Sequence, residues 1–269
     1  MVSYPIVAGV DLRTMTGGLG TVNDTIADGV IQEVNDDGTE RWRWTMTDHF
    51  NPATSTFPLN FGVPPDLIPG FPDAWDVFHI NAIDREPDGD YVVTVRHMDG
   101  VFRVNRNADP QHAEGEVEWT LGTPDLAGAK RLDIKGDPWL GPKRPHDARL
   151  EGDVLTMLDN QAGVPGRVPR AVAYRIDVAA GTATMLWEIR NPAPGGATLG
   201  SVQQTADSVV INWGAGQQPF LEELAPNGTR LMAVGLPNSG NSYRTIKYPP
   251  ADFDVNVLRQ QAGGSVTPP

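Results

Sequence analysis

The feature that most limits the fold is a pair of alternating strands around a turn, which recurs four times. Alternation of apolar and polar residues with a period of two is typical of half-buried strands, and a glycine-containing turn between two such runs indicates a hairpin. The four hairpins span residues 30–44, 101–121, 171–189 and 220–234. A chain built this way is expected to be all-β.

Two further strands precede each of the last three hairpins. They are residues 78–84 and 90–96, residues 145–151 and 153–159, and residues 200–206 and 208–214. Repeated units of four antiparallel strands are the signature of β-propeller blades. We therefore expect a β-propeller of four-stranded antiparallel blades, with about four blades' worth of sequence in this chain. A β-sandwich is the alternative.

Some expected strands lie outside the three complete blades. Three blades are whole, at residues 78–121, 145–189 and 200–236, whereas the hairpin at 30–44 and an expected strand at 242–248 belong to others. We assign residues 1–250 to the propeller and residues 251–269 to a C-terminal extension and flexible tail. The loop at 51–76 is long and rich in proline, and is expected to be a lid or a plug between blades.

Charge and composition restrict the partners. The formal net charge of −13 disfavours nucleic acid and anionic membranes. The chain has no cysteine, which excludes thiol catalysis and disulfides. No apolar run reaches the roughly 18 residues of a membrane span. As written, the chain lacks a signal peptide, and an extracytoplasmic location is expected if an upstream segment is missing.

Polar side chains recur on the strands that would line the propeller axis. Several of them in equivalent positions favour a polar funnel, although hydrogen-bonded core residues are the alternative reading for the histidines. The residues concerned are His79, Asn81, His146, Gln203, Tyr243 and Arg244.

The order of several motifs resembles the arylsulfotransferase family. The motifs are WDVFHINAID, GDYVVTVRHMDGVFRVNR, GEVEWTLG, HDARL, MLDNQ, PRAVAYRID and NSYRTIKY, with DGVIQEVNDDGTERWRWTMTDH upstream. The resemblance implies a six-bladed propeller that moves a sulfuryl group between phenols without the nucleotide donor PAPS. It also implies a sulfohistidine intermediate, no cofactor, and a small aromatic sulfate and a phenol as partners.

The chain departs from this family in two ways. Family members usually carry more sequence upstream, so an upstream segment or a second chain would complete the propeller. No histidine follows His146, and Gln203 stands near the place where a nucleophilic histidine is expected. A non-catalytic propeller that binds an anionic ligand or a partner protein is therefore the alternative function. A hydrolase or lyase that acts on sulfated or acidic sugars is a third.

The resemblance and the chemistry of sulfuryl transfer assign roles to named residues. His146 is the expected nucleophile, and His79 the expected acid or sulfate clamp. Arg170 would hold the sulfate oxygens through its planar guanidinium. No short spacing of metal ligands occurs, so no metal site is expected. The expected substrate-binding residues are Asn81, Arg96, Gln203, Tyr243 and Arg244.

Overall fold

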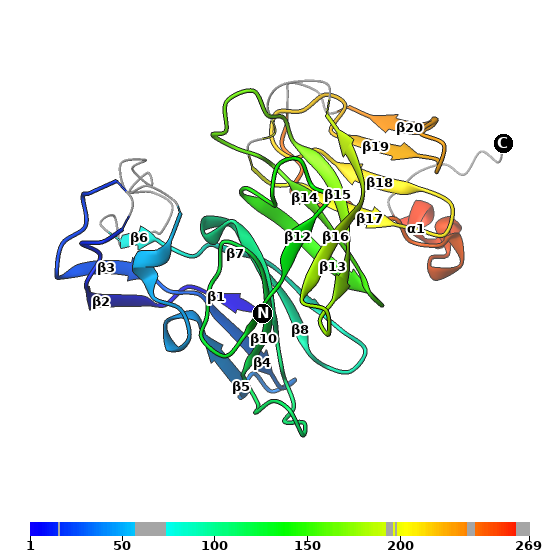
Figure 1. Cartoon of the computed structure of the whole chain (residues 1–269). Helices are drawn as coiled ribbons and strands as arrows, with labels where there is room; N and C mark the ends of the chain where they lie inside the picture. Colours follow the sequence, from blue (N-terminus) through cyan, green and yellow to red (C-terminus); the bar gives the residue numbers. More distant parts are fainter. Residues whose placement is uncertain (16, 57–73, 192–195, 197, 236–239, 262–269) are drawn as a thin grey trace.

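Strands make up nearly all of the regular structure. The computed structural model describes residues 1–15, 17–56, 74–191, 196, 198–235 and 240–261. Five sheets with mainly antiparallel pairing are described, the last three in chain order (Figure 1), and the expected all-β, propeller-type architecture is confirmed.

The first part of the chain forms two small sheets. One contains β1 (Val2–Ser3), β4 (Val30–Val34) and β5 (Glu40–Thr45). The other contains β2 (Ile6–Val10), β3 (Asp24–Ala27) and β6 (Ala74–Asp76), and was not predicted. The short 3-10 helices η1 (Met46–Asp48) and η2 (Pro52–Thr54) follow β5. Most of the expected lid, residues 57–73, lies outside the described residues.

The three expected complete blades are present. They are counted here as the second, third and fourth, with the hairpin at 30–44 in the first. The second contains β7 (Ile80–Arg85), β8 (Tyr91–Val95), β9 (Gly100–Val104) and β10 (Val117–Gly122). The third contains β13 (Pro145–Glu151), β14 (Val154–Asp159), β15 (Arg170–Asp177) and β16 (Thr182–Arg190). The fourth contains β17 (Ser201–Gln204), β18 (Val209–Asn212), β19 (Leu221–Leu224) and β20 (Arg230–Val234). Two unpredicted short strands, β11 (Lys130–Arg131) and β12 (Asp133–Lys135), add in parallel to β10 and β16.

The core lies between the faces of neighbouring blades. In β14, Leu155 and Met157 belong to the apolar cluster shared with the second blade, and Leu158 to the cluster shared with the fourth. Because both faces of a middle blade are covered, its inner strands read as nearly continuous apolar runs. Burying one such side chain contributes about 2 kcal/mol.

Each complete blade is entered through a residue with a positive φ angle. His79, Arg144 and Leu199 have φ angles of 56°, 58° and 65° and come just before the inner strands. His79 therefore precedes β7, which starts at Ile80. The expectation that His79 lies within the strand at 78–84 is wrong, because its left-handed conformation interrupts the extended backbone.

The expected strand at 242–248 is not a strand. This segment runs beside β17, but side chains bind it: Thr245 N–H donates to Ser201 Oγ at 3.0 Å, and Lys247 N–H donates to Gln203 Oε1 at 2.7 Å. The same two side chains donate back to the carbonyls of Thr245 and Lys247. Side chains of β17, in place of its backbone groups, thus bind the main chain of residues 242–248. Alternation of apolar and polar residues therefore predicted a strand that does not form.

The C-terminal extension is short and exposed in its described part. It contains η5 (Pro250–Asp252) and the helix α1 (Val255–Gln261). Among the described helices, none combines the length and apolar character needed to cross a membrane.

Candidate functional site

A carboxylate and an imidazole form a dyad at the entrance to the second blade. The Nδ1 atom of His79 binds the Oδ2 atom of Asp76, which ends β6. Burial acts to raise the pKa of Asp76, but the bond from His79 and the nearby cations lower it below its ordinary value. An ionised Asp76 fixes the proton of His79 on Nδ1. The lone pair of Nε2 then stays available on a ring whose side chain is 34% exposed.

His97 and Arg96 lie directly behind this dyad, on the 3-10 helix η3 (Arg96–Met98) that follows β8. The rings of His97 and His79 have centroids 4.7 Å apart. The Nδ1 atom of His97 lies 2.5 Å from the main-chain oxygen of Asp76, and its Nε2 atom lies 2.6 Å from Nη1 of Arg96. Burial lowers the pKa of His97 well below its ordinary value, so His97 is a neutral imidazole.

Arg96 provides a partly buried cation beside the dyad. Burial and the neighbouring Arg144 lower the pKa of Arg96 to about 10, so Arg96 is still charged at neutral pH. The charge of Arg144 is balanced by Asp99, whose Oδ1 atom lies 3.3 Å from Nη1 of Arg144. A partly desolvated guanidinium at this position favours an anion.

Aromatic and amide groups line the other side of the dyad. The hydroxyl of Tyr243 donates to the main-chain oxygen of Asn81 at 3.3 Å, and the hydroxyl of Tyr4 donates to that of Ile80. The Nδ2 group of Asn81 donates to Pro145 at 2.8 Å, while its buried Oδ1 has no hydrogen-bond partner among the described residues. The side of the site that faces β13 therefore has a buried amide oxygen without a partner and a half-exposed phenol ring.

His146 is buried close by, with both ring nitrogens engaged. Its Nδ1 atom binds Oδ1 of Asn160 at 2.6 Å, and its Nε2 atom accepts the N–H of Leu199 at 3.1 Å. Burial and the charge of Arg96 lower the pKa of His146 to about 3. The imidazole is 1% exposed. In this arrangement His146 presents no lone pair to a substrate.

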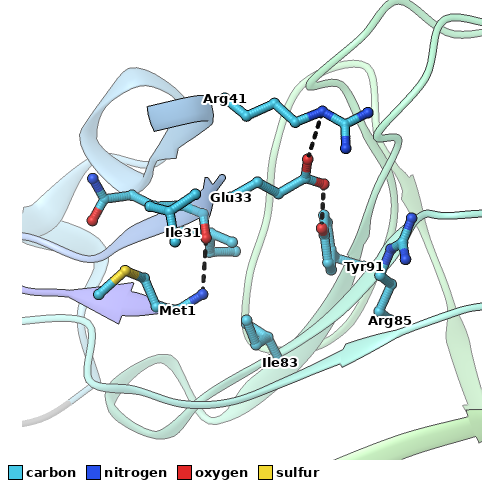
Figure 2. A pocket seen from close by; sticks show the side chains of 9 residues that line it. Met1, Ile31, Glu33, Arg41, Ile83, Arg85 and Tyr91 are labelled. Atoms are coloured by element: carbon cyan, nitrogen blue, oxygen red, sulfur yellow. Dashed lines mark hydrogen bonds and ion pairs between the residues drawn. The ribbon is translucent and has the colours of Figure 1, made fainter. Parts of the chain in front are cut away.

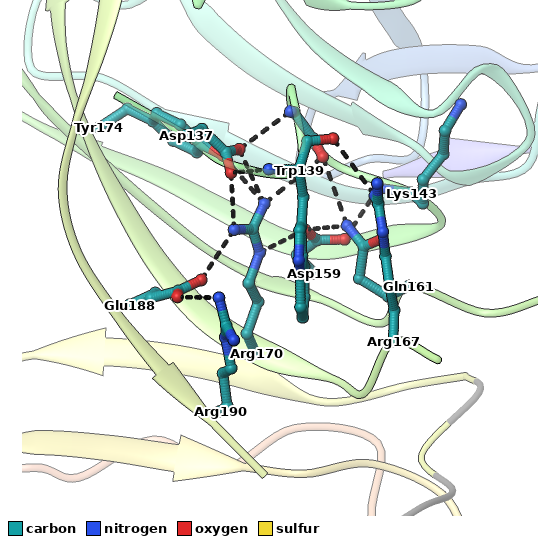
Figure 3. Close-up of polar contacts among 11 residues, drawn as sticks. Asp137, Trp139, Lys143, Asp159, Gln161, Arg167, Arg170, Tyr174, Glu188 and Arg190 are labelled. Atoms are coloured by element: carbon teal, nitrogen blue, oxygen red, sulfur yellow. Dashed lines mark hydrogen bonds and ion pairs between the residues drawn. The ribbon is translucent and has the colours of Figure 1, made fainter. Parts of the chain in front are cut away.

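Arg170 is fully buried and lies in a separate network of charges (Figure 3). Its guanidinium donates to Asp137, Asp159 and Glu188 at 2.8–2.9 Å. One face of the guanidinium packs 4.5 Å from the ring centre of Trp139. The donors that the family resemblance reserves for sulfate are thus taken by carboxylates, and the geometry gives Arg170 a structural place.

The two remaining predicted residues also have internal partners. The side-chain amide of Gln203 donates to the carbonyl oxygen of Lys247 and accepts from its N–H. Arg244 lies 2.8 Å from Oδ1 of the buried Asp147. The structure therefore gathers His79, Asn81, Arg96 and Tyr243 at one place, with His146 and Arg244 at its margin, and it leaves Arg170 and Gln203 outside.

Asp76, His79 and His97 also have the donor types of a metal site. Their ligand atoms lie within 4.8 Å of one another, and two imidazoles with a carboxylate are a common zinc set. However, Nδ1 of His97 faces a carbonyl and so carries the proton, while Nε2 accepts from Arg96. This hydrogen bonding uses the lone pair of His97. It therefore favours a hydrogen-bonded cluster of the three residues over a metal centre.

A pocket of about 450 Å³ opens at the opposite end of β7 (Figure 2). Glu33 crosses it to bind the hydroxyl of Tyr91 at 2.5 Å and lies 3.8 Å from Arg41. The length of β7 separates this pocket from His79, so it is not part of the candidate site.

Sequence reasoning missed Asp76, His97, Arg144 and Tyr4. Asp76 precedes His79 by three residues, and this spacing was the available signal. It brings the two side chains together here because the chain turns at the positive φ angle of His79. The other three had no local signal, because each meets the site over a long stretch of sequence: Tyr4 from the N-terminal segment, Arg144 from the next blade, and His97 from 21 residues beyond Asp76.

Comparison with protein families identifies the chain. The family model for arylsulfotransferase (ASST) matches residues 6–218, which is most of the sequence. The chain belongs to the arylsulfotransferase family. This agrees with the resemblance seen in the motifs, and the matched range includes the dyad, His97 and the Arg170 network. A comparison with curated proteins finds no match.

Solved structures similar to this arylsulfotransferase-family chain are distant. A Lactobacillus plantarum protein is 12% identical, with a TM-score of 0.42, over 77% of this chain and 51% of that one. A candidate 6-phosphogluconolactonase from Bacteroides fragilis is 13% identical, with a TM-score of 0.44, over 85% and 57%. The periplasmic gluconolactonase of Pseudomonas aeruginosa is 13% identical, with a TM-score of 0.33, over 92% and 71%. The chain thus spans little more than half the length of the first two structures.

Proposed function

We propose that this chain carries a sulfuryl group on the Nε2 atom of His79, taking it from a phenolic sulfate ester and passing it to a second phenol. Membership of the arylsulfotransferase family supports the reaction class. The observation that carries the choice of nucleophile is the bond between Asp76 and Nδ1 of His79, which leaves Nε2 as the lone pair. His146, the nucleophile expected from the sequence, has both nitrogens engaged.

The first half-reaction balances without an added cofactor. The lone pair of His79 Nε2 forms a bond to sulfur, the bond from sulfur to the aryl oxygen breaks, and a phenolate leaves with that electron pair. The product imidazolium keeps its proton on Nδ1, where the carboxylate of Asp76 stabilises the new positive charge. The carboxylate therefore assists the step most strongly as charge develops.

The second half-reaction returns the electron pair. The oxygen of an acceptor phenol attacks sulfur, the N–S bond breaks, and Nε2 regains its lone pair. The proton of the acceptor passes to water or to the released phenolate. The half-exposed ring of Tyr243 offers the acceptor phenol an aromatic wall.

Arg96 is the proposed holder of the sulfuryl oxygens. Its guanidinium binds the imidazole of His97, which packs against His79. Because Arg96 is mostly buried, a sulfate there would meet a cation with little competing solvent. This local positive charge lets a chain of net charge −13 accept an anionic donor.

The test is intact-protein mass spectrometry after incubation with 4-nitrophenyl sulfate and alkaline quenching. We expect the mass of one SO3 group to be added to the wild-type chain and to His146→Gln, and fragmentation to place it on His79. His79→Gln should gain nothing. Labelling of His146 would contradict the choice of nucleophile. Protection against heat by sulfate, without labelling of any histidine, would contradict transfer and support a non-catalytic anion-binding propeller.

A further inference from the structure

We propose that His97 is the positioning residue of this site, and that one imidazole and its main chain hold both the carboxylate that orients His79 and the guanidinium of Arg96. The inference rests on the proposed function, since it concerns how the nucleophile is kept in place. His97 itself does not touch the reacting atoms. It lies behind the ring of His79 and is 3% exposed.

The side chain of His97 makes two directional bonds of opposite sense. Nδ1 donates to the main-chain oxygen of Asp76 at 2.5 Å, and Nε2 accepts from Nη1 of Arg96 at 2.6 Å. A neutral imidazole is suited to this pair of bonds, because one ring nitrogen donates while the other accepts. A protonated ring would place two donors face to face at Arg96, so burial of His97 maintains the arrangement.

The main chain of His97 fixes the surroundings. Its carbonyl oxygen accepts from Thr56 N–H at 2.8 Å, Thr56 Oγ1 at 3.0 Å and Ser55 Oγ at 3.1 Å. Its N–H donates to Phe78 at 3.0 Å, just before the positive φ angle of His79. His97 thus joins Ser55 and Thr56, the end of β6 and the entry to β7.

These contacts make Asp76 and His79 depend on His97 in a specific way. Asp76 is held twice, by its side chain to His79 and by its main chain to His97. Loss of the second bond would leave the carboxylate on the end of a three-residue strand. Displacement of catalytic groups by about 1 Å is sufficient to cost about 100-fold in rate.

The first measurement is independent of turnover. Nitrogen-15 NMR of the histidine rings reports which nitrogen of His79 is protonated, in the ligand-free wild type, His97→Phe and His97→Gln. We expect the Nδ1–H tautomer in the wild type, a clear gain of the Nε2–H tautomer in His97→Phe, and a smaller gain in His97→Gln, whose amide can donate and accept. His112→Gln, at an exposed hairpin loop, is the matched control.

The second measurement is the rate at which 4-nitrophenyl sulfate labels His79. His97→Phe should lower this rate about 100-fold and raise the half-saturating donor concentration, and His97→Gln should recover about tenfold of the loss. A tautomer and a labelling rate that stay at the wild-type values in His97→Phe would overturn the inference. If that variant does not fold, the same comparison with His97→Gln decides the matter. Absence of labelling in the wild type would instead refute the proposed function, and the tautomer measurement would still test the positioning.

Discussion

The N–H group of Leu199 donates a hydrogen bond to Nε2 of His146 at 3.1 Å. The two residues come from different blades, since His146 lies in β13 and Leu199 precedes β17. Asn160 strengthens this connection, because its side chain binds Nδ1 of His146 and the carbonyls of Gly196 and Leu199. The histidine expected to attack sulfur is thus positioned as a link between the third and fourth blades.

Replacing His146 by alanine should destabilise the protein more than it slows chemistry. The change leaves a cavity and removes the partners of Asn160 Oδ1 and of the Leu199 N–H, and we expect the free energy of unfolding to fall by about 2–4 kcal/mol. Urea denaturation measures this, with His112→Ala as the control. Labelling of His79 should persist in the folded fraction. Normal stability combined with loss of labelling would show that His146 acts in the chemistry.

Replacing Asp76 by asparagine should slow sulfuryl transfer to His79 about 100-fold while leaving donor affinity nearly unchanged. The amide can still accept from Nδ1, but it carries no charge to stabilise the imidazolium. Single-turnover release of 4-nitrophenol measures the rate. Asp109→Asn is a matched control, because Asp109 also pairs with a histidine three residues away, at the surface. Equal rates in Asp76→Asn and the wild type would exclude the dyad from the mechanism.

Replacing Arg170 by methionine should destabilise the fold by about 3–5 kcal/mol, because buried carboxylates lose their shared cation. Arg175→Met is the control from the same strand, since its pair with Asp153 is exposed and should contribute less than about 1 kcal/mol. Chemical denaturation compares the two. A stable Arg170→Met that has lost donor binding would instead restore the sulfate-holding role implied by the family resemblance.

The charged form of Glu33 should stabilise the folded state, so this contribution to the free energy of unfolding should be lost in acid. The bond from Arg106, assisted by Tyr91 and opposed by burial, lowers the pKa of Glu33 from 4.5 to about 2. A lowered pKa stabilises the folded state above pH 4.5, and this stabilisation disappears as the pH falls toward 2. After allowance for solvent screening, we expect Glu33→Gln to cost about 1–2 kcal/mol at pH 7 and almost nothing near pH 2. A constant difference across this range would show that Glu33 contributes through packing alone.

The blades were predictable because their signal is local. Strands such as β14 and β15 are covered on both faces, and their apolar runs and intervening glycine turns are visible in the sequence. Expecting His79 and Asn81 at one site required only the order of strands within a blade. The family resemblance supported the same order and is matched by the family model.

The site's connections were not predictable, because they depend on backbone geometry and long-range pairing. The positive φ angle of His79 turns its ring toward Asp76, and no residue preference announces it. Arg170 follows a proline in a loop-like stretch, and nothing local indicates that Asp137, 33 residues away, meets its guanidinium. Sequence reasoning located the neighbourhood of the site but not its hydrogen bonds.

The segment at 242–248 has a consequence for how this protein tolerates change. In an ordinary strand pair the register survives most substitutions, because backbone amides hold it. Here the side chains of Ser201 and Gln203 supply most of the hydrogen bonds to the segment, through the main chain of Thr245 and Lys247. Point changes at these two positions would therefore loosen Thr245 and Lys247, while the ladder of the fourth blade and the main-chain bond from Gly200 N–H to Tyr243 at 2.9 Å remain. The end of the chain beside the site thus depends on individual side chains, and its tolerance to mutation differs from one residue to the next.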